Sequence, residues 1–555
     1  MRSESRPVVS RDRIVSIALL VVGGGFLLVS VFQSNIWFDE SYSVAIASHS
    51  FSEIWSIGSH DVHPVLYYWM LHLVYLAFGS SIIAFRLFSV LGSMAMAVLG
   101  VTCVAKDFGR TTGWLFAFLS LFVPVVGFMC LQVRMYSWAS FSVALTAVFA
   151  CRIALATSRA ADEKSVAAPG GGEVPAGWWV VLFGASLASA YLHYYAAIAA
   201  FLVNVFLLVV LLRYRGTCKR RIRTFLCGAV VTVACYLPWV MALAGQVSHV
   251  SGGFWIEMSF PGTAYDILDY LVLTPAMLEA VGGSCGNVLQ ALATIVSVAV
   301  AVCAAALSGW MVVQLWRHVL AARAARRQPS RKVSPADPAL VMAWCGMGVY
   351  GGIIAIALAV SLAMGQAVLY FRYLYVALCF PLFFFSVALS RVDRRQVTGV
   401  VCGLTLAASV ISQAVMASDY YAAEDHAAVD YYVEKVQELS GDTGGALVVS
   451  DNIGISGVLA QRRPDISIEY LDVYTDTAQA YEAYAPTIGI VESLHDTLDD
   501  YSGRYVVLET TDVLGDDQSV YDFAEEYDSE VVEIREFVYP YTSEDGIYIV
   551  AVLER

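Results

Sequence analysis

Charged side chains are scarce in this chain of 555 residues: Asp, Glu, Lys and Arg together make up only 14%, while hydrophobic residues make up 58%. A soluble enzyme of this length, folded into several domains, would present a much larger charged surface to water. The composition therefore excludes a soluble multidomain protein. It indicates a polytopic membrane protein, for which the bilayer is the main solvent.

Cysteine is missing from residues 418–555, and most of the 11 cysteines lie within apolar stretches, whereas Cys285 falls in a long loop. A disulfide framework is thus excluded for the carboxyl-terminal part. P-loop, Walker and zinc-finger patterns are missing from the sequence as well, and so are repeats of solenoid period. Neither a soluble nucleotide-binding module nor a nucleic-acid partner is expected.

Apolar stretches long enough for a bilayer core, which takes about 20 helical residues, recur up to residue 417. Eleven spans are predicted, at residues 14–33, 81–104, 113–130, 136–156, 178–192, 195–212, 224–244, 287–316, 340–363, 370–390 and 396–417. Arginines precede the first span, which we expect to be a retained anchor and not a cleaved signal. The predicted fold class is a polytopic α-helical membrane protein with about 11 transmembrane helices.

The residue pattern changes after residue 417. EDHAAVDYYVEKVQEL (424–439) has the apolar spacing of a helix, and ALVVS (446–450) reads as a buried strand, with further strand-like runs behind it. This alternation predicts a small α/β domain over 418–555, after a transmembrane domain over 1–417. Asp451 and Asn452 end the first strand, where open α/β sheets often bind ligands, although an ordinary turn is the preferred explanation for both residues.

Lys and Arg accumulate in the amino-terminal segment and at 213–223, 317–332 and 391–395, and the positive-inside rule assigns such loops to the cytoplasm. Residues 418–555 carry 31 acidic and 6 basic side chains, a net charge of −25, whereas residues 1–417 carry 16 acidic and 27 basic ones, a net charge of +11. We therefore expect a multi-pass protein of the cell membrane with a cytoplasmic amino terminus. Loop 34–80 and the acidic α/β domain should be extracytoplasmic.

Ionisable side chains follow the first span directly. Asp39 and Glu40 lie in WFDESYS, and Asp61 and His63 lie in DVHP, all within loop 34–80. A solvated loop would carry such groups at little cost, but aromatic residues surround them in the sequence and favour an interfacial pocket. These aromatic residues are Trp37, Phe38, Trp55, Tyr67, Tyr68 and Trp69. The apolar spacing from Ser41 to Trp55 also predicts one helix in the membrane interface, as a lid over the acids.

Further polar residues mark the predicted outer ends of the spans. They are Arg86 in an early span, Arg134 and Tyr136 in VRMY, His193 and Tyr194 in LHYY, and Arg372 and Tyr373 in FRYLY. Any one of them could be a snorkelling or hydrogen-bonded structural residue. Polar groups in an apolar span are costly, however, and their gathering on the side that carries Asp39 favours a functional role.

Taken in order, the motifs WFDESYS, DVHPVLYY, VRMY, LHYY, PWV…GGFWI and FRYLY, over residues 10–417, resemble the membrane glycosyltransferases of the GT-C superfamily. The most similar members are bacterial ones related to protein O-mannosyltransferases and lipid-A aminoarabinose transferases. The resemblance implies an inverting transferase that uses a polyprenyl-phosphate sugar donor at the outer face, with Asp39 as catalytic base. Relatives often read QEARMY where this chain reads LQVRMY, so an expected carboxylate is replaced by Gln132.

The expected chemistry needs a base for an acceptor hydroxyl and cations for the lipid phosphate. We assign catalysis to Asp39 and Glu40, phosphate and donor binding to Arg134, Tyr136, Arg372 and Tyr373, and substrate positioning to Asp61, His63, Tyr67, His193 and Tyr194. A divalent cation (Mg²⁺, Mn²⁺ or Zn²⁺) on Glu40, Asp61 and His63 stays an open alternative, because their spacing matches no standard site. The expected partners are a polyprenyl-phosphate-linked sugar, membrane lipids and a cell-envelope glycan, lipid or protein as acceptor.

Two other functions fit parts of the sequence. A transporter or flippase of the lipid-linked sugar would also use many spans and buried arginines, but it would place polar groups near mid-membrane, where these spans are mostly apolar. An inactive scaffold that displays the acidic domain would not need the acidic DE pair and the HPVLYY motif together.

Overall fold

The computed structural model divides the chain into two compact units, which are described separately. A helical unit comprises residues 1–32 and 86–415, and a second unit combines residues 33–85 with residues 416–555. Loop 34–80 is thus grouped with the carboxyl-terminal part of the chain. The structure describes residues 11–29, 31–32, 36, 38–61, 63–163, 174–216, 218–250, 263, 267, 287–327, 337–365, 368–415, 425–440, 446–451, 453–463, 466–470, 482–485, 487–490, 497–498, 501–511, 517–539 and 546–555.

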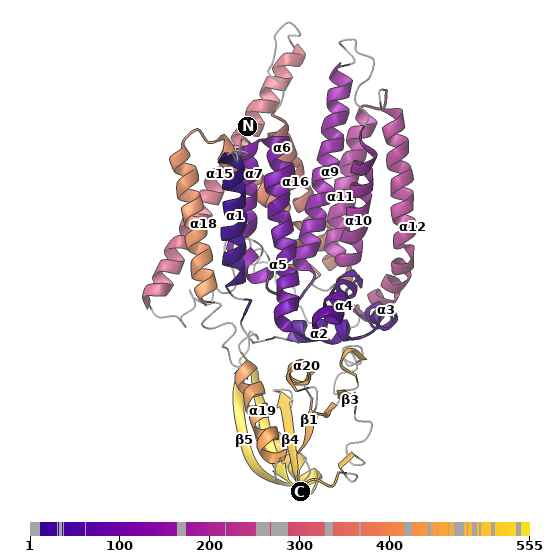
Figure 1. The fold of residues 1–555 in the computed structure, drawn as a ribbon, viewed down its shortest axis with the longest axis vertical. Coiled ribbons are helices and arrows are strands. Elements are labelled where there is room, and N and C mark those ends of the chain that lie inside the picture. Colours follow the sequence, from indigo (N-terminus) through magenta and orange to yellow (C-terminus); the bar gives the residue numbers. More distant parts are fainter. Residues whose placement is uncertain are drawn as a thin grey trace, which may run out of the picture. The chain divides into compact units, whose positions relative to one another are not determined.

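Long apolar helices make up the helical unit (Figure 1). They are α1 (Arg11–Leu28), α5 (Ile82–Leu99), η1 (Gly100–Val104), α6 (Ala105–Phe108), α7 (Arg110–Phe122), α8 (Pro124–Met129), α9 (Tyr136–Glu163), α10 (Ala176–Leu192), α11 (Tyr194–Arg213), α12 (Lys219–Val250), α15 (Asn287–Arg327), α16 (Pro338–Met364), η2 (Phe371–Ala377), α17 (Cys379–Arg391) and α18 (Arg395–Val415). Each of the eleven predicted spans overlaps at least one described helix. Among the described residues, seven helices are long and apolar enough to cross a membrane, or eight if the bent pair η2 and α17 counts as one.

Two predicted spans are interrupted. Residues 113–130 form two helices, because Pro124 cannot continue α7 and instead occupies the first turn of α8. Residues 370–390 consist of η2 and α17, which are bent by 62°. The predicted class, a polytopic helical membrane protein with a carboxyl-terminal α/β domain, is confirmed, while these two spans are more irregular than the sequence indicated.

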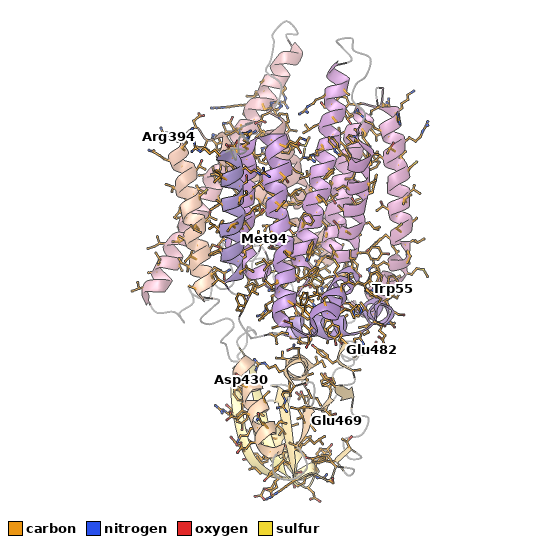
Figure 2. The ribbon with its side chains drawn as sticks, viewed as in Figure 1. Trp55, Met94, Arg394, Asp430, Glu469 and Glu482 are labelled. Atoms are coloured by element: carbon orange, nitrogen blue, oxygen red, sulfur yellow. The ribbon has the colours of Figure 1, made fainter. Side chains whose placement is uncertain are left out.

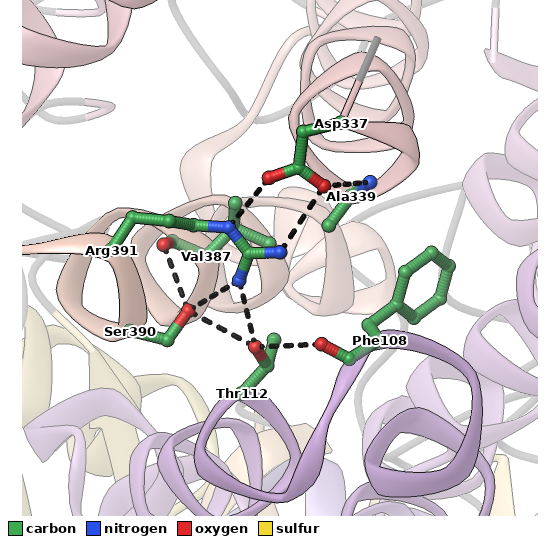
Figure 3. Close-up of polar contacts among 7 residues, drawn as sticks. All are labelled: Phe108, Thr112, Asp337, Ala339, Val387, Ser390 and Arg391. Atoms are coloured by element: carbon green, nitrogen blue, oxygen red, sulfur yellow. Dashed lines mark hydrogen bonds and ion pairs between the residues drawn. The ribbon is translucent and has the colours of Figure 1, made fainter. Parts of the chain in front are cut away.

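A polar network joins α7, α16 and α17 where these helices meet (Figure 3). The Arg391 guanidinium donates to both carboxylate oxygens of Asp337, with its Nε at 2.7 Å, and it also donates to Thr112. Asp337 in turn caps α16 by accepting from the backbone N–H of Ala339. Paired Arg–carboxylate bonds of this kind fix orientation as well as contact, so the network holds the three helices in register. The exposed Arg394 follows in the turn before α18, whereas Met94 lies along α5 (Figure 2).

The second unit contains three short helices from the loop and a six-stranded sheet (Figure 1). The helices are α2 (Phe38–Ser48), α3 (Phe51–His60) and α4 (Leu66–Phe78), and α19 (Asp425–Ser440), α20 (Ile453–Arg462) and α23 (Asp517–Glu526) accompany the sheet. The strands are β1 (Ala446–Ser450), β2 (Ile468–Tyr470), β3 (Ile488–Ile490), β4 (Tyr505–Thr511), β5 (Glu530–Tyr539) and β6 (Gly546–Glu554). Acidic side chains such as Asp430, Glu469 and Glu482 belong to this part of the unit (Figure 2).

The sheet has the order β3-β2-β1-β4-β6-β5, in which the first four strands are parallel and β6 runs antiparallel between β4 and β5. Its core is formed by Val449, Val506, Leu508, Val520, Ala551 and Leu553, all nearly inaccessible to solvent. The predicted helix at 424–439 and strand at 446–450 are confirmed, whereas β3 escaped prediction. Asp451, at the end of β1, is buried, and Asn452 lies outside the described residues.

The predicted single helix from Ser41 to Trp55 is wrong, because α2 and α3 are separate. α2 ends at Ser48, and Ser50 begins α3 through a capping box: its side chain accepts from the backbone N–H of Glu53, whose carboxylate accepts from the Ser50 N–H. This S-x-x-E pattern is a start signal that competes with the continuous apolar spacing. The loop therefore forms a bent pair of helices, not one straight lid.

Candidate functional site

Aromatic rings from three separate segments of the helical unit form one cluster. The ring centroid of His193 lies 5.7 Å from that of Tyr136 and 5.3 Å from that of Tyr373. Tyr195 completes the group at 5.4 Å from Tyr373. These spacings are those of favourable edge and tilted ring pairs. The structure thus brings together three of the residues that the sequence singled out, and we call Tyr136, His193, Tyr195, Tyr370 and Tyr373 the ring cluster.

The backbone at each contributing segment explains the convergence. His193 has extended backbone between α10 and α11 and caps α11, where its Nδ1 accepts from the Tyr195 N–H at 3.1 Å. An accepting Nδ1 leaves the proton of a neutral imidazole on Nε2. Tyr136 begins α9, which α5 approaches closely: a Cβ on Gly92 would lie 2.8 Å from the backbone carbon of Ser137. Only glycine leaves room for that approach.

Arg372 lies in η2, next to Tyr373 of the ring cluster. Its guanidinium carbon is 5.1 Å from the ring centroid of Tyr370, within the range of a cation–π contact. The ring of Tyr370 is in turn 5.4 Å from that of Tyr373. The hydroxyl of Tyr195 donates to the Val368 carbonyl at 2.6 Å, which holds the segment before η2 against α11. The Arg372 guanidinium therefore lies beside the ring cluster, in a segment that α11 holds through Tyr195.

Residues 130–135 connect α8 and α9 without helical structure and are buried throughout. Gln132 is 1% exposed and Arg134 is 4% exposed. Within the part of the chain that the structure describes, neither amide atom of Gln132 has a hydrogen-bond partner. A buried amide group without a partner costs about 1–3 kcal/mol, and non-helical backbone at membrane depth is tolerated only inside protein or beside a cavity. Burial of the Gln132 amide therefore costs free energy that no hydrogen bond among the described residues offsets.

Tyr194 belongs to a different neighbourhood. Its hydroxyl donates to the Gln246 side chain and accepts from the Trp239 indole N–H at 3.2 Å, so it faces α12. Its predicted neighbour in function, His193, points into the ring cluster instead. The adjacent pair in LHYY is thus divided between two sets of contacts.

In the second unit, α2 carries Asp39 and Glu40 in its first turn. Glu40 is completely buried, whereas Asp39 is partly accessible. The hydroxyl of Ser43 donates to the Asp39 carbonyl at 2.9 Å, which ties the backbone of this turn. A carboxylate at the start of a helix is favoured by the N–H groups and the dipole at that end. Of the two acids, Asp39 is the more accessible.

Asp61 and His63 form a pair between α3 and α4, with 3.6 Å between the Asp61 carboxylate and His63 Nδ1. Tyr67 is fully buried behind them in α4, with its ring 6.1 Å from that of Tyr68. Among the described residues, no three His, Cys, Asp or Glu side chains gather in a way that could hold a metal ion. Glu40, Asp61 and His63 thus do not meet as the predicted ligand set, although Asp61 and His63 do pair.

The aromatic residues predicted around the acids form two groups. Trp55 stacks on Trp69 at 5.9 Å between α3 and α4, and Tyr42 contacts both Phe38 and Tyr68. Trp37 and the GGFWI motif lie outside the described residues. The sequence did not assign roles to Tyr195 and Tyr370, although both belong to motifs that it singled out, LHYY and the start of YFRYLY. Their contacts to His193 and Arg372 are local in sequence, whereas the ring contact of Tyr195 with Tyr373 depends on tertiary structure.

Comparison with protein-family models and with curated proteins finds no match. Among solved structures, the chain is similar to ArnT from Cupriavidus metallidurans, crystallised with undecaprenyl phosphate, with a TM-score of 0.47 and 12% sequence identity. The similarity covers 96% of this chain and 97% of that one.

Proposed function

We propose that this protein is a glycosyltransferase of the GT-C kind, which moves a sugar from a polyprenyl-phosphate donor to an acceptor hydroxyl at the outer face of the membrane. The observation that carries the proposal is the ring cluster with Arg372 beside it and Arg134 just before Tyr136. A guanidinium group beside aromatic rings, with a second buried arginine two residues before one of these rings in the sequence, suits an anion that arrives on a lipid tail.

A phosphate is the anion that fits best. The planar guanidinium fork meets phosphate oxygens through paired hydrogen bonds, and at about 4 Å and an effective dielectric constant of about 20 such a contact amounts to about 4 kcal/mol before desolvation. Tyrosines present an apolar ring and a polar tip and so suit the boundary between lipid and headgroup. Arg134, Tyr136, Arg372 and Tyr373 are assigned to the donor phosphate, and His193 supports the rings among which they lie.

Asp39 is the proposed base. It takes the proton of the acceptor hydroxyl as the acceptor oxygen bonds to the anomeric carbon, while the bond from that carbon to the phosphate oxygen breaks and polyprenyl phosphate leaves with the electron pair. The departing phosphate is already a stable anion, so no acid is required for the leaving group, in contrast to the two carboxyl groups of a glycosidase. Glu40, which is buried, supports the turn that carries Asp39, and Asp61, His63 and Tyr67 position the acceptor.

The sidedness of the chain follows from its charge. The basic loops of residues 1–417, together with the acidic net charge of residues 418–555, support an outer carboxyl-terminal part and a cytoplasmic amino terminus. A cysteine introduced at Ser440 should react with a membrane-impermeant thiol reagent on intact cells, and one at Gln328 should react only after lysis. The reverse pattern would put the acids in the cytoplasm and contradict an outward-facing enzyme.

The test of the proposed function is transfer by the purified, reconstituted protein with each donor in turn. Polyprenyl-phosphate monosaccharides should support transfer, and nucleotide sugars supplied without polyprenyl phosphate should not. Transfer from a nucleotide sugar alone would refute the proposal. Movement of the lipid-linked sugar across the vesicle membrane without transfer would instead identify a flippase.

A further inference from the structure

Two hydroxyl groups link the first turn of α2 to the carboxyl-terminal part of the chain. The Ser41 hydroxyl donates to the Phe38 carbonyl at 2.8 Å, and the Tyr484 hydroxyl lies 2.7 Å from the same serine oxygen. A serine hydroxyl has one hydrogen, and a carbonyl can only accept, so Tyr484 is the donor to Ser41. Hydrogen bonds therefore connect Tyr484 to Ser41 and Ser41 to the carbonyl of Phe38, the residue before Asp39.

A second contact holds the other end of α2. His49, which directly follows α2, lies with its Nε2 2.9 Å from the Ala483 carbonyl. The rings of Tyr42 and Tyr484 are 6.2 Å apart, and α2 packs against α20. Adjacent residues 483 and 484 thus bind both ends of the helix that carries the proposed base. Bonds at both ends restrict rotation of α2 about its axis as well as its displacement.

Tyr484 is itself fixed by α20. It is 5% exposed, and a Cβ on Gly457, in the middle of α20, would lie only 2.3 Å from its hydroxyl oxygen. Glycine within a helix is unfavourable, because it loses more backbone freedom than other residues. At position 457, glycine leaves the space that the Tyr484 hydroxyl needs. The sequence of α20 is therefore suited to holding this tyrosine in place.

We propose that Tyr484 is a positioning residue, through which the carboxyl-terminal α/β part of the chain orients the first turn of α2 and with it the Asp39 carboxylate. The inference rests on the proposed function for the role of Asp39, but the contact itself does not. Proton transfer requires the base within hydrogen-bond reach of the acceptor, and small misplacement of such a group lowers the rate strongly. The contribution of the α/β part to catalysis is thus limited to the position that Tyr484 gives to the first turn of α2.

The test compares three variants of the full-length protein. Tyr484→Phe removes only the hydroxyl, and Gly457→Ala fills the space beside it. Tyr501→Phe is the matched control, because the Tyr501 hydroxyl also bonds within the α/β part, accepting from Leu447 N–H and donating to the Tyr505 carbonyl. Transfer kinetics from a polyprenyl-phosphate sugar and hydrogen exchange of the amides of residues 41–46 are measured for each variant.

Tyr484→Phe and Gly457→Ala should lower kcat about three- to ten-fold, the effect of one net hydrogen bond, without raising KM for the donor. Both should also speed exchange in α2, whereas Tyr501→Phe should change neither. A kcat for Tyr484→Phe within two-fold of the wild type, or an equal loss in Tyr501→Phe, would overturn the inference. If the wild type used no lipid-linked donor at all, the proposed function would fail, while unchanged exchange in α2 would reject the positioning contact independently.

Discussion

The guanidinium of Arg372 lies over the ring of Tyr370, with its central carbon 5.1 Å from the ring centroid. A cation–π contact of this length restricts the position and orientation of the guanidinium, whose planar N–H fork can meet a phosphate through paired hydrogen bonds. Tyr370 contacts Tyr373, and Tyr373 contacts His193, so the orientation is passed on from the ring cluster. This arrangement distinguishes a site built for a planar, two-pronged contact from a generally basic surface.

Arg372→Ala should therefore lower kcat/KM for a polyprenyl-phosphate sugar by on the order of 10²-fold, because a desolvated charge-assisted bond of about 2–3 kcal/mol is lost. Arg372→Lys should recover only part of the rate, since an ammonium group keeps the charge but neither the fork nor the stacking. Arg394→Ala, at an exposed turn, is the control and should leave kinetics unchanged. Equal activity of the lysine variant and the wild type would argue against two-pronged recognition.

Asp39→Asn should reduce transfer at least 10²-fold while the protein stays folded and still binds polyprenyl phosphate, because the amide has nearly the same size but cannot take the proton. Glu40→Gln should reduce the rate less, and its effect should appear mainly as lost thermal stability, since Glu40 is buried. If Asp39→Asn kept more than about a tenth of the wild-type rate, Asp39 would need another role. A flippase would continue to move lipid-linked sugar in this variant.

Gln132→Leu separates a structural role of the buried amide from a role in binding. Leucine is similar in volume and removes two polar atoms that have no hydrogen-bond partner among the described residues, so thermal stability should be unchanged or slightly higher. If the amide contacts substrate, the same variant should lose transfer activity by about ten-fold or more. A large loss of stability would show instead that the amide supports the fold of residues 130–135.

The pair between α19 and β5 predicts a pH dependence. Lys435 Nζ lies 2.8 Å from the Glu533 carboxylate, and this bond, with one from Tyr431, lowers the pKa of Glu533 below its ordinary value of 4.5. A lowered carboxyl pKa contributes stability that is present above pH 4.5 and is lost as pH falls through the folded-state pKa. The same bond raises the pKa of Lys435, whose contribution is lost only at strongly alkaline pH. The protection factors of the α19 amides, which correct for the intrinsic pH dependence of hydrogen exchange, should therefore fall in acid.

Glu533→Gln should make exchange in α19 faster near neutral pH and should weaken its acid dependence, because the titrating group is gone. Glu525→Gln, at an exposed position of α23, is the control and should keep the wild-type profile. An acid dependence that is identical in wild type and Glu533→Gln would assign it to other carboxylates.

The apolar spans were readable from the sequence because a bilayer demands long runs without charge, and each predicted range overlaps at least one described helix. The points where these helices are interrupted were harder to predict from the sequence. Pro124 and the Ser50–Glu53 capping box are local signals that a count of apolar residues passes over. In the α/β part, the alternation of helix and strand sufficed for α19, β1, β4, β5 and β6, whereas the three-residue β3 was too short to show a pattern.

The candidate site was readable only as separate motifs. The sequence singled out Tyr136, His193 and Tyr373 because each lies in a motif at the predicted outer end of a span. Their ring contacts followed only from tertiary structure. Tyr194, marked with equal weight, faces Gln246 and Trp239 instead. The partner of Ser41 could not be foreseen, because one hydroxyl among many tyrosines gives no signal at such a sequence distance.

The bond between Ser41 and Tyr484 joins residues 443 positions apart, so the order of synthesis separates its two halves. At about 5–20 residues per second, α2 would wait on the order of tens of seconds for the tyrosine that anchors it. Every described helix of the helical unit except α1 is made within that interval. A nascent chain would thus pass through membrane insertion with its acidic helix unanchored, and competence for transfer would arise only when assembly is nearly finished.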